Sequence, residues 1–183
     1  MLPLLAAALA AALIGIAPSD SLNRTVRREA APVTSRAAAA AALRADSIVV
    51  EKRLRRLTLF AGGTPVKRYA IALGRNPEGK KVQIGDFRTP EGVYYIESRM
   101  PQSRYYRALR ISYPDQLDRL RAQSLGLTAG GDILIHGLPN GRESVGAAHR
   151  RTDWTEGCIA VTNQELDEIW AAVPDGAVIQ IKP

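Results

Sequence analysis

A histidine and a cysteine stand where the sequence could build thiol chemistry. His136-Gly137 directly follows Ile133-Leu134-Ile135, an apolar run typical of a buried strand, and Gly157-Cys158 comes about twenty residues later. An imidazole at a strand end can face a cleft and take the proton of a nearby thiol, which at its usual pKa of about 8.5 is mostly protonated at neutral pH. Each residue alone is more often structural. The pair predicts a reactive thiol if the fold brings the two side chains together.

The second histidine is a rival for the role of base. His149 lies in the polar, arginine-flanked stretch 147–151, which is typical of a loop, and it precedes Cys158 by nine residues. We favour His136, and substitution of each histidine in turn would separate the two assignments.

The small number of cysteines and histidines excludes two classes of domain. One thiol cannot close an internal disulfide, and one thiol with two imidazoles cannot complete a structural zinc site without carboxylates. The net charge of +7 favours acidic partners, which include nucleic acid, anionic lipid and an anionic cell-wall polymer. Nucleic acid is the weakest of these, because much of the excess charge lies in residues 18–45 and no nucleic-acid motif is present.

Three regions of different composition divide the chain. Residues 1–17 contain an uncharged apolar run, which predicts a signal peptide or an uncleaved membrane anchor and therefore export to the periplasm or cell envelope. Residues 18–45 are rich in alanine and arginine and predict a cationic linker, which an anionic membrane or wall polymer would attract. Residues 46–183 carry strand, turn and cap signals throughout, which predicts one folded domain.

Short apolar runs with regular turn signals predict a mainly β domain. Strands are expected at residues 48–50, 57–60, 66–73, 93–97, 133–135 and 178–181. Turns are expected at 62–65, 76–79 and 89–92, and the segment 103–110 is expected to form a loop at the cleft. Lys52 to Arg56 predict a polar strand face and Lys80-Lys81 a solvated turn. The expected fold is a β barrel or sandwich with two or three short helices.

Two helices have clear start signals. Residues 116–124 follow the cap residue Asp115, and the helix presents an apolar side formed by Leu117, Leu120 and Leu125. The second helix begins after Thr162, where Glu165 completes a capping box, and it places an apolar stripe just after the cysteine segment.

The spaced motifs resemble those of a known family. The string from His136-Gly137 through Thr155-Glu156-Gly157-Cys158-Ile159, with the Thr89-Pro90-Glu91-Gly92 turn and Asn163, resembles the catalytic domain of the L,D-transpeptidases, which are bacterial cell-wall enzymes. The resemblance covers nearly all of residues 46–183. It implies a barrel-like β fold with the cysteine at the mouth of a cleft and no cofactor or metal. It also implies attack on peptidoglycan stem peptides, at the bond between the L-centre of the third residue and the terminal D-alanine.

The resemblance also assigns roles to single residues. Cys158 corresponds to the nucleophile, His136 to its base, and the carbonyl of Gly137 to the oxygen that orients a histidine. The backbone amides of Gly157 and Cys158 correspond to an oxyanion site. The resulting thioester would pass to an amine, which gives a crosslink, or to water, which gives trimming. Substrate contacts are expected from four residues near the cleft: Tyr105, Arg107, Trp154 and Thr155.

The sequence departs from the usual family motif at two positions. Glu156 replaces a histidine that many members have, and Ala160 replaces an arginine. A carboxylate facing the thiol would disfavour the thiolate, so we expect Glu156 to point away or to pair with a cation such as Arg151. Two alternatives stay open: an L,D-carboxypeptidase, and a module of the same fold that binds peptidoglycan without turnover. A papain-like peptidase is disfavoured because its cysteine precedes its histidine in the chain.

Overall fold

The computed structural model describes residues 43–183. The expected signal peptide or anchor and nearly all of the expected linker lie outside the described residues, and both remain predictions. Packing begins slightly before residue 46, because Ala45 is buried and its amide donates to Ala172 O at 2.9 Å. Within residues 43–183, no helix has the length and apolar character needed to cross a membrane.

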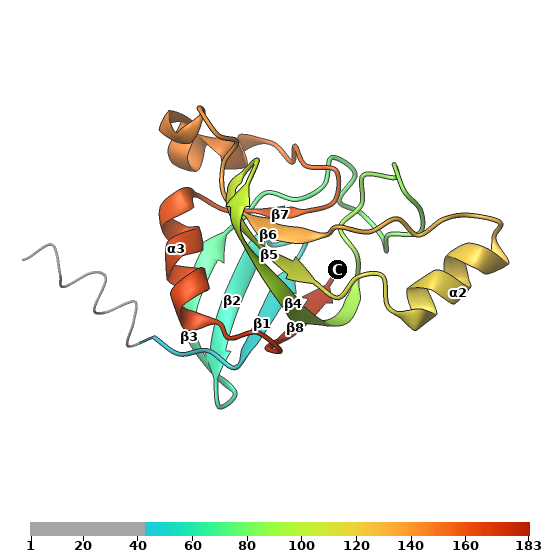
Figure 1. The fold of residues 1–183 in the computed structure, drawn as a ribbon, viewed down its shortest axis with the longest axis horizontal. Coiled ribbons are helices and arrows are strands. Elements are labelled where there is room, and N and C mark those ends of the chain that lie inside the picture. The colour runs from blue at the N-terminus through green and yellow to red at the C-terminus, as the bar shows by residue number, and fades with distance from the viewer. Residues whose placement is uncertain (1–42) are drawn as a thin grey trace, which may run out of the picture. The chain divides into compact units, whose positions relative to one another are not determined.

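Eight strands form one sheet across the described residues, in the order β3-β2-β1-β8-β4-β5-β6-β7 (Figure 1). This confirms the mainly β fold class. The strands are β1 (Ser47–Glu51), β2 (Arg56–Ala61), β3 (Thr64–Ala70), β4 (Gly92–Ser103), β5 (Tyr106–Ile111), β6 (Leu134–His136), β7 (Ile159–Ala160) and β8 (Val178–Lys182).

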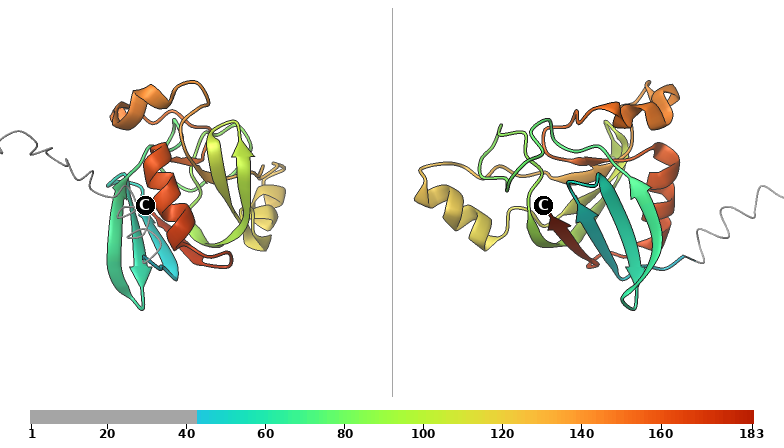
Figure 2. Two further views of the ribbon diagram at one scale, coloured as in Figure 1. Left: turned by 60° about the vertical axis from the view of Figure 1, so that its left-hand side comes forward. Right: turned by 180° about the vertical axis from the view of Figure 1, so that it is seen from behind.

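The long strand β4 joins the two halves of the sheet. Its first residues pair with β8, and from Ile96 onward it pairs with β5. The pairing with β5 contains register shifts between Ile96 and Ser98 and between Met100 and Ser103. Such bulges bend a strand and increase its twist. The sheet therefore turns at β4, and the strands β5, β6 and β7 lie at an angle to β1, β2 and β3 (Figure 2).

Helix α3 (Asn163–Ala172) lies across the opening between the two halves (Figure 2). It contacts β5 and β6 on one side, and on the other its Glu168 accepts a hydrogen bond from Tyr69 of β3 at 3.2 Å. The predicted capping box is present, because Thr162 and Glu165 bond each other's backbone amides. The position of the helix start is fixed by these local bonds, directly after β7.

Helix α2 (Gln116–Ser124) begins at the predicted cap, but its predicted apolar face was wrong. Asp115 caps the helix, whereas Leu117 and Leu120 are exposed and the buried residues are Asp118 and Ala122. The cause is a long-range contact, since Asp118 accepts a hydrogen bond from the buried Tyr94 hydroxyl at 2.9 Å. That bond turns the leucines outward.

The segment expected to be a loop forms a hairpin instead. Met100 pairs with Ala108 and Ser103 with Tyr106, so residues 103–110 contain the hairpin turn and most of β5. Two consecutive residues of β5, Ala108 and Leu109, are both buried. Apolar and polar residues therefore do not alternate along β5, and the period-two signal of a strand is absent.

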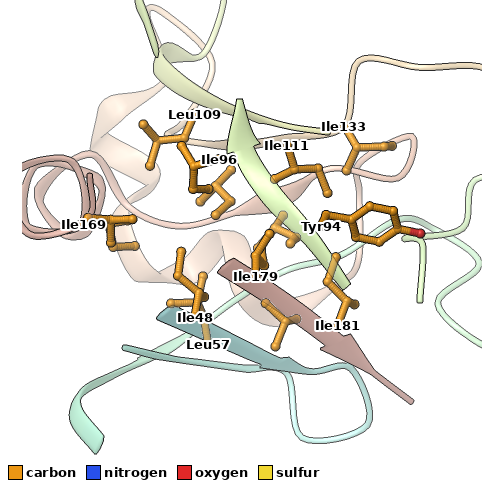
Figure 3. Close-up of a cluster of buried hydrophobic side chains, with 14 of the residues drawn as sticks. Ile48, Leu57, Tyr94, Ile96, Leu109, Ile111, Ile133, Ile169, Ile179 and Ile181 are labelled. Atoms are coloured by element: carbon orange, nitrogen blue, oxygen red, sulfur yellow. The ribbon is translucent and has the colours of Figure 1, made fainter. Parts of the chain in front are cut away.

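A continuous apolar core fills the space inside the bent sheet (Figure 3). It is made mostly of branched side chains from every part of the sheet and from α3, including Ile48, Leu57, Ile96, Leu109, Ile111, Ile169, Ile179 and Ile181. Burial of such side chains is the main favourable term in folding, at about 1.5–3 kcal/mol each. This core supports the strand ends on which the cleft is built.

A buried lysine supports the loops beside the sheet, at a position where the sequence predicts a polar strand face. Lys52, predicted to lie on a polar strand face, is only 2% exposed. Its Nζ donates to Gly79 O at 2.7 Å and Thr89 O at 3.0 Å and pairs with Glu91 Oε1 at 2.7 Å. The lysine therefore joins both predicted turns, although burial lowers its pKa.

Replacing Lys52 with methionine should lower the free energy of unfolding by about 3–5 kcal/mol, because the Glu91 carboxylate and two carbonyls would lose their buried partner. Denaturant unfolding followed by circular dichroism measures the effect. The matched control is Arg53→Met at the exposed neighbouring position, where we expect a change within about 0.5 kcal/mol. Equal effects of the two substitutions would contradict a supporting role for Lys52.

Candidate active site

The parallel pairing of β6 with β7 places the two predicted reactive residues on one face of the sheet. Ile135 pairs with Ile159 and His136 with Ala160. Continued by one residue, this register sets Cys158 opposite Leu134, two positions from His136. Side chains two residues apart on a strand share a face, so the thiol and the imidazole are diagonal neighbours. Both line one cleft, which has a volume of about 470 Å³.

The His136 imidazole is held in one orientation. Its Nδ1 lies 2.7 Å from Gly137 O, and because a carbonyl only accepts, Nδ1 carries the proton and leaves Nε2 as the basic atom. The ring packs against two aromatic rings that also contact each other, with Tyr105 at 4.5 Å and Trp154 at 5.6 Å between centroids. Burial lowers the pKa of His136 to about 4, so the imidazole is neutral at pH 7.

Gly137 is fixed by the helix that follows the cysteine. Asn163 Oδ1 accepts a hydrogen bond from the Leu138 amide at 2.8 Å. A Cβ atom at Gly137 would lie 2.5 Å from the same oxygen, so a larger residue would displace the Asn163 side chain from this bond. Asn163, which belongs to the motif that carries the family resemblance, thereby holds the segment that carries His136.

The Cys158 thiol is neutral in this structure. Burial raises the pKa of the thiol to about 11, and the nearby carboxylates of Asp132 and Glu156 act in the same direction. A backbone hydrogen bond with Leu134 and the charge of Lys81 act against them. The thiol donates to Asp132 O at 3.5 Å rather than to His136. The resting site is therefore a neutral thiol beside a neutral imidazole.

The threonine before the cysteine acts within its own loop. Thr155 is buried; its Oγ1 donates to Cys158 O at 2.8 Å and accepts from the Gly157 amide at 3.1 Å. The Thr155 hydroxyl, which was expected to contact substrate, is therefore already hydrogen-bonded within the protein. The Gly157 amide, which was expected to bind an oxyanion, donates to this same hydroxyl. Of the two predicted oxyanion donors, the Cys158 amide is the one that does not bond to Thr155 Oγ1.

Two glycines let three chain segments meet behind the thiol. A Cβ at Gly74 would lie 2.1 Å from Phe87 O, and a Cβ at Gly157 would lie 2.7 Å from Arg88 O. Gly157 also has a φ of 132°, which other residues rarely adopt. Backbone bonds reinforce the contact, because the Arg75 amide donates to Thr155 O at 3.0 Å.

The structure brings some of the predicted substrate residues to the cleft and not others. Tyr105, Trp154 and Thr155 line it together with His136. The prediction for Arg107 was wrong: its guanidinium pairs with Asp167 at 3.3 Å and stacks on Trp170 at 5.1 Å, both on α3. Arg107 belongs to strand β5 rather than to a loop, so its direction is set by the pleat of the sheet.

Three charged residues of the cleft were missed as site residues. Arg75, Lys81 and Asp132 line it together with Glu156. Lys81, expected in a solvated turn, is buried and pairs with Asp86 at 2.8 Å. No local pattern marks these residues, because each reaches the cleft through pairing of distant segments. Glu156 does pair with a cation as expected, but the cation is Arg75, at 3.4 Å, and not Arg151.

His149 lies behind the cleft wall instead of lining the cleft. It is buried in the 3₁₀ helix η1 (Glu143–Arg151), and its Nδ1 accepts a long hydrogen bond from Trp154 Nε1 at 3.4 Å. Burial and the charge of Arg150 lower the pKa of His149 to about 4. Within residues 43–183, no three His, Cys, Asp or Glu side chains lie close enough together to hold a metal ion.

Comparison with known families agrees with this geometry. The sequence matches the YkuD family, the L,D-transpeptidase catalytic domain, over residues 45–181. The chain belongs to the L,D-transpeptidase family. The resemblance stated from the motifs is thereby confirmed.

The related proteins are longer than this chain. YafK of Escherichia coli K12 is 35% identical over 107 residues, which cover 57% of this chain and 35% of YafK. The K307A mutant of the helical cell shape determining protein Pgp2 from Campylobacter jejuni is 26% identical, with a TM-score of 0.58 over 76% of this chain and 47% of that one. Bd1075 of Bdellovibrio bacteriovorus shares the fold, with 22% identity and a TM-score of 0.54 over 77% of this chain and 49% of that one. The chain thus spans about a third to a half of these proteins.

Substitution of Gly157 should destabilise this L,D-transpeptidase domain and disturb the position of the Cys158 thiol. Gly157→Ala places a Cβ against the Arg88 carbonyl in a disfavoured backbone conformation. The matched control is Gly176→Ala, since Gly176 has a φ of 81° but open space around it. We expect Gly176→Ala to lower the free energy of unfolding by about 1–2 kcal/mol. Gly157→Ala should lower it by about 1–3 kcal/mol more. Thermal unfolding measures both, and equal losses would show that the close approach is unimportant.

The reactivity of Cys158 should depend on pH as that of a buried neutral thiol does. Because the thiolate is the reactive form and burial raises the thiol pKa to about 11, alkylation by iodoacetamide should rise steadily between pH 6 and 9 without a plateau. At pH 8 it should be roughly a hundredfold slower than in the same protein unfolded in denaturant, where the only cysteine has an ordinary pKa. A plateau below pH 8 would instead indicate a thiolate-imidazolium pair.

Proposed function

We propose that this domain is a cysteine acyltransferase that cleaves the L,D-bond of peptidoglycan tetrapeptide stems and passes the acyl group to an amine or to water. The observation that carries the proposal is the location of Cys158 and His136 on one wall of the same cleft, diagonal to each other on paired strands. Membership of the L,D-transpeptidase family supports the reaction class.

In the first step, His136 Nε2 takes the thiol proton as Cys158 Sγ attacks the carbonyl carbon at the L-centre of the third stem residue. The oxyanion that forms can accept a hydrogen bond from the Cys158 amide, a type of contact worth about 3–4 kcal/mol. The carbon–nitrogen bond to D-alanine then breaks, and His136 returns the proton to the leaving amine. The product is a thioester on Cys158, with a neutral imidazole again beside it.

A neutral resting pair suits this sequence of proton transfers. The thiol proton is given up only when a carbonyl carbon is available, because burial disfavours a free thiolate and a free imidazolium alike. A bound stem peptide would also replace water in the cleft and strengthen the interaction of the oxyanion with its donor. Tyr105 and Trp154 would keep the imidazole facing the substrate.

In the second step, the acceptor loses a proton to His136 and attacks the thioester, and the thiolate of Cys158 leaves and is protonated. A stem-peptide amine as acceptor gives a crosslink, a protein amine attaches that protein to the wall, and water gives a tripeptide. The last outcome is L,D-carboxypeptidase action. The same acylation step serves all three.

We also propose that the protein acts outside the cytoplasm, where this substrate lies. Residues 1–17 would direct export or anchor the chain, and the basic residues of 18–45 would hold it near anionic membrane or wall polymer. The attraction is about 1 kcal/mol for each basic residue near such a surface. Fractionation of cells into cytoplasm, membrane and periplasm tests the location, and recovery from the cytoplasm alone would overturn it.

Incubation of the full-length protein with a disaccharide-tetrapeptide tests the proposed reaction. We expect release of D-alanine and a protein mass increase that Cys158→Ser abolishes, because the thioester needs the sulfur. Dimeric products would identify a transferase and tripeptide a hydrolase. His136→Ala should lower D-alanine release by at least a hundredfold, whereas His149→Ala should retain most of it. Intact substrate with measurable binding would favour a non-catalytic module, and loss of activity in His149→Ala alone would transfer the role of base to His149.

A further inference from the structure

Arg75 is fixed beside the nucleophile by the backbone. The segment 72–75 runs along residues 155–160, which we call the cysteine loop. Ala72 and Ala160 exchange both backbone hydrogen bonds, at 3.0 and 2.9 Å. The Thr155 amide donates to Leu73 O at 3.1 Å, and the Arg75 amide donates to Thr155 O at 3.0 Å. The Arg75 guanidinium also stacks on the Phe87 ring, 4.2 Å from its centroid. The side chain therefore projects from a rigid base at the rim of the cleft.

The ion pair that Arg75 forms with Glu156 is open to exchange. The nitrogen and oxygen lie 3.4 Å apart, and the side chains are 51% and 81% exposed. A pair of this kind contributes little to stability, so a ligand can take over either partner at low cost. Because each residue sits in the cleft wall near the thiol, both can meet a group that is bound next to Cys158.

The other charged residues of the cleft wall are more firmly engaged. Lys81 is buried against Asp86, and its ammonium also donates to Gln83 O at 3.0 Å. Asp132 is 73% exposed, but it pairs with Arg110 at the shorter distance of 2.9 Å. Among the charged side chains that line the cleft, Arg75 and Glu156 thus form the loosest pair. They offer one positive and one negative charge side by side.

The position that lacks the family arginine is linked to this pair. Ala160 is fully buried and bonds to Ala72, so a long charged side chain has no room there. Arg75 follows Ala72 by three residues in the segment that pairs with Ala160. The cation nearest to Glu156 therefore comes from this neighbouring segment, where the Arg75 amide bonds to Thr155 O.

From these contacts we propose that Arg75 and Glu156 form a subsite for a zwitterionic α-amino-acid group, with Arg75 on the carboxylate and Glu156 on the ammonium. The inference rests on the proposed function, in which D-alanine leaves as such a group. Before cleavage, the stem presents only the terminal carboxylate, which pairs with Arg75. After cleavage, the free amine of D-alanine is protonated and pairs with Glu156. An entering α-amino-acid group would bind in the same way, since the acceptor replaces the leaving group on the thioester.

The first test measures binding without turnover. In a Cys158→Ser background, calorimetry compares a tetrapeptide that ends in a carboxylate with one that ends in an amide. We expect the acid to bind about tenfold more tightly, and Arg75→Gln to remove this preference. Glu156→Gln should leave it unchanged or increase it, because the carboxylate loses a like-charged neighbour. Arg53→Gln, an exposed arginine outside this cleft, is the matched control and should change nothing.

The second test uses the active enzyme and labelled acceptors. Exchange of labelled D-alanine into the tetrapeptide should show a KM at least fivefold higher in both Arg75→Gln and Glu156→Gln, with kcat within about twofold. Exchange of ethylamine, which has no carboxylate, should be unaffected by Arg75→Gln. Equal effects on both acceptors would overturn the subsite, because the pair would then act on the thioester rather than on the acceptor.

Further outcomes of these tests show which chemical group occupies the subsite. They also separate the subsite proposal from the proposed reaction. If Arg75→Gln affects only donors with a free carboxylate at the side-chain end of the third residue, that group occupies the site and our assignment to the leaving group is wrong. Equal binding of acid and amide peptides by the Cys158→Ser protein overturns the subsite whether or not the enzyme turns over. A preference for the acid that Arg75→Gln removes, together with no D-alanine release by the unsubstituted protein, supports the subsite and rejects the proposed reaction.

Discussion

The parallel pairing of β6 and β7 is the constraint on which the site depends. Strand β7 has only two residues, and it would not hold a position in the sheet by itself. It is fixed from three directions: by β6, by the backbone bonds between Ala72 and Ala160, and by the capping box of α3 that begins at Thr162. The cysteine loop is therefore closed at both ends. If the proposed reaction takes place, this fixed geometry avoids the entropic cost of ordering the thiol and the imidazole.

Burial controls the electrostatics of that site more than any single charge does. It raises the pKa of the thiol and lowers that of the imidazole, so the two shifts keep both groups neutral. The replacement of a histidine by Glu156 adds a negative charge that raises the thiol pKa further. Arg75, which pairs with that carboxylate at 3.4 Å, places a positive charge beside it. The charge that departs from the family motif is therefore paired by a residue that lies far away in the sequence.

Local rules predicted the parts of this structure that depend on neighbouring residues. Both helix starts follow from short capping signals, and the His-Gly and Gly-Cys motifs mark the two strand ends of the site. The failures share a different cause. The inward face of α2 is chosen by the contact of Asp118 with Tyr94, the burial of Lys52 by two distant turns, and the place of Arg75 by its pairing with the cysteine loop. Such partners are separated by tens of residues, and no periodic pattern in the sequence predicts these contacts.

The charged residues around the cleft fall into two groups with different work. Behind the site, Lys52 is fully enclosed, and Asp153 accepts both the Leu73 amide at 2.9 Å and the Arg55 guanidinium at 2.7 Å. Lys52 is a buried ion with all its bonds satisfied, which resists movement because any displacement leaves a charge without a partner. Asp153 is only 14% exposed and holds the Leu73 backbone as well as Arg55. Inside the cleft, the Arg75–Glu156 pair is long and exposed. Rigid pairs behind the loops and a loose pair at the rim are what a site needs if its backbone must stay fixed while its surface exchanges one charged ligand for another.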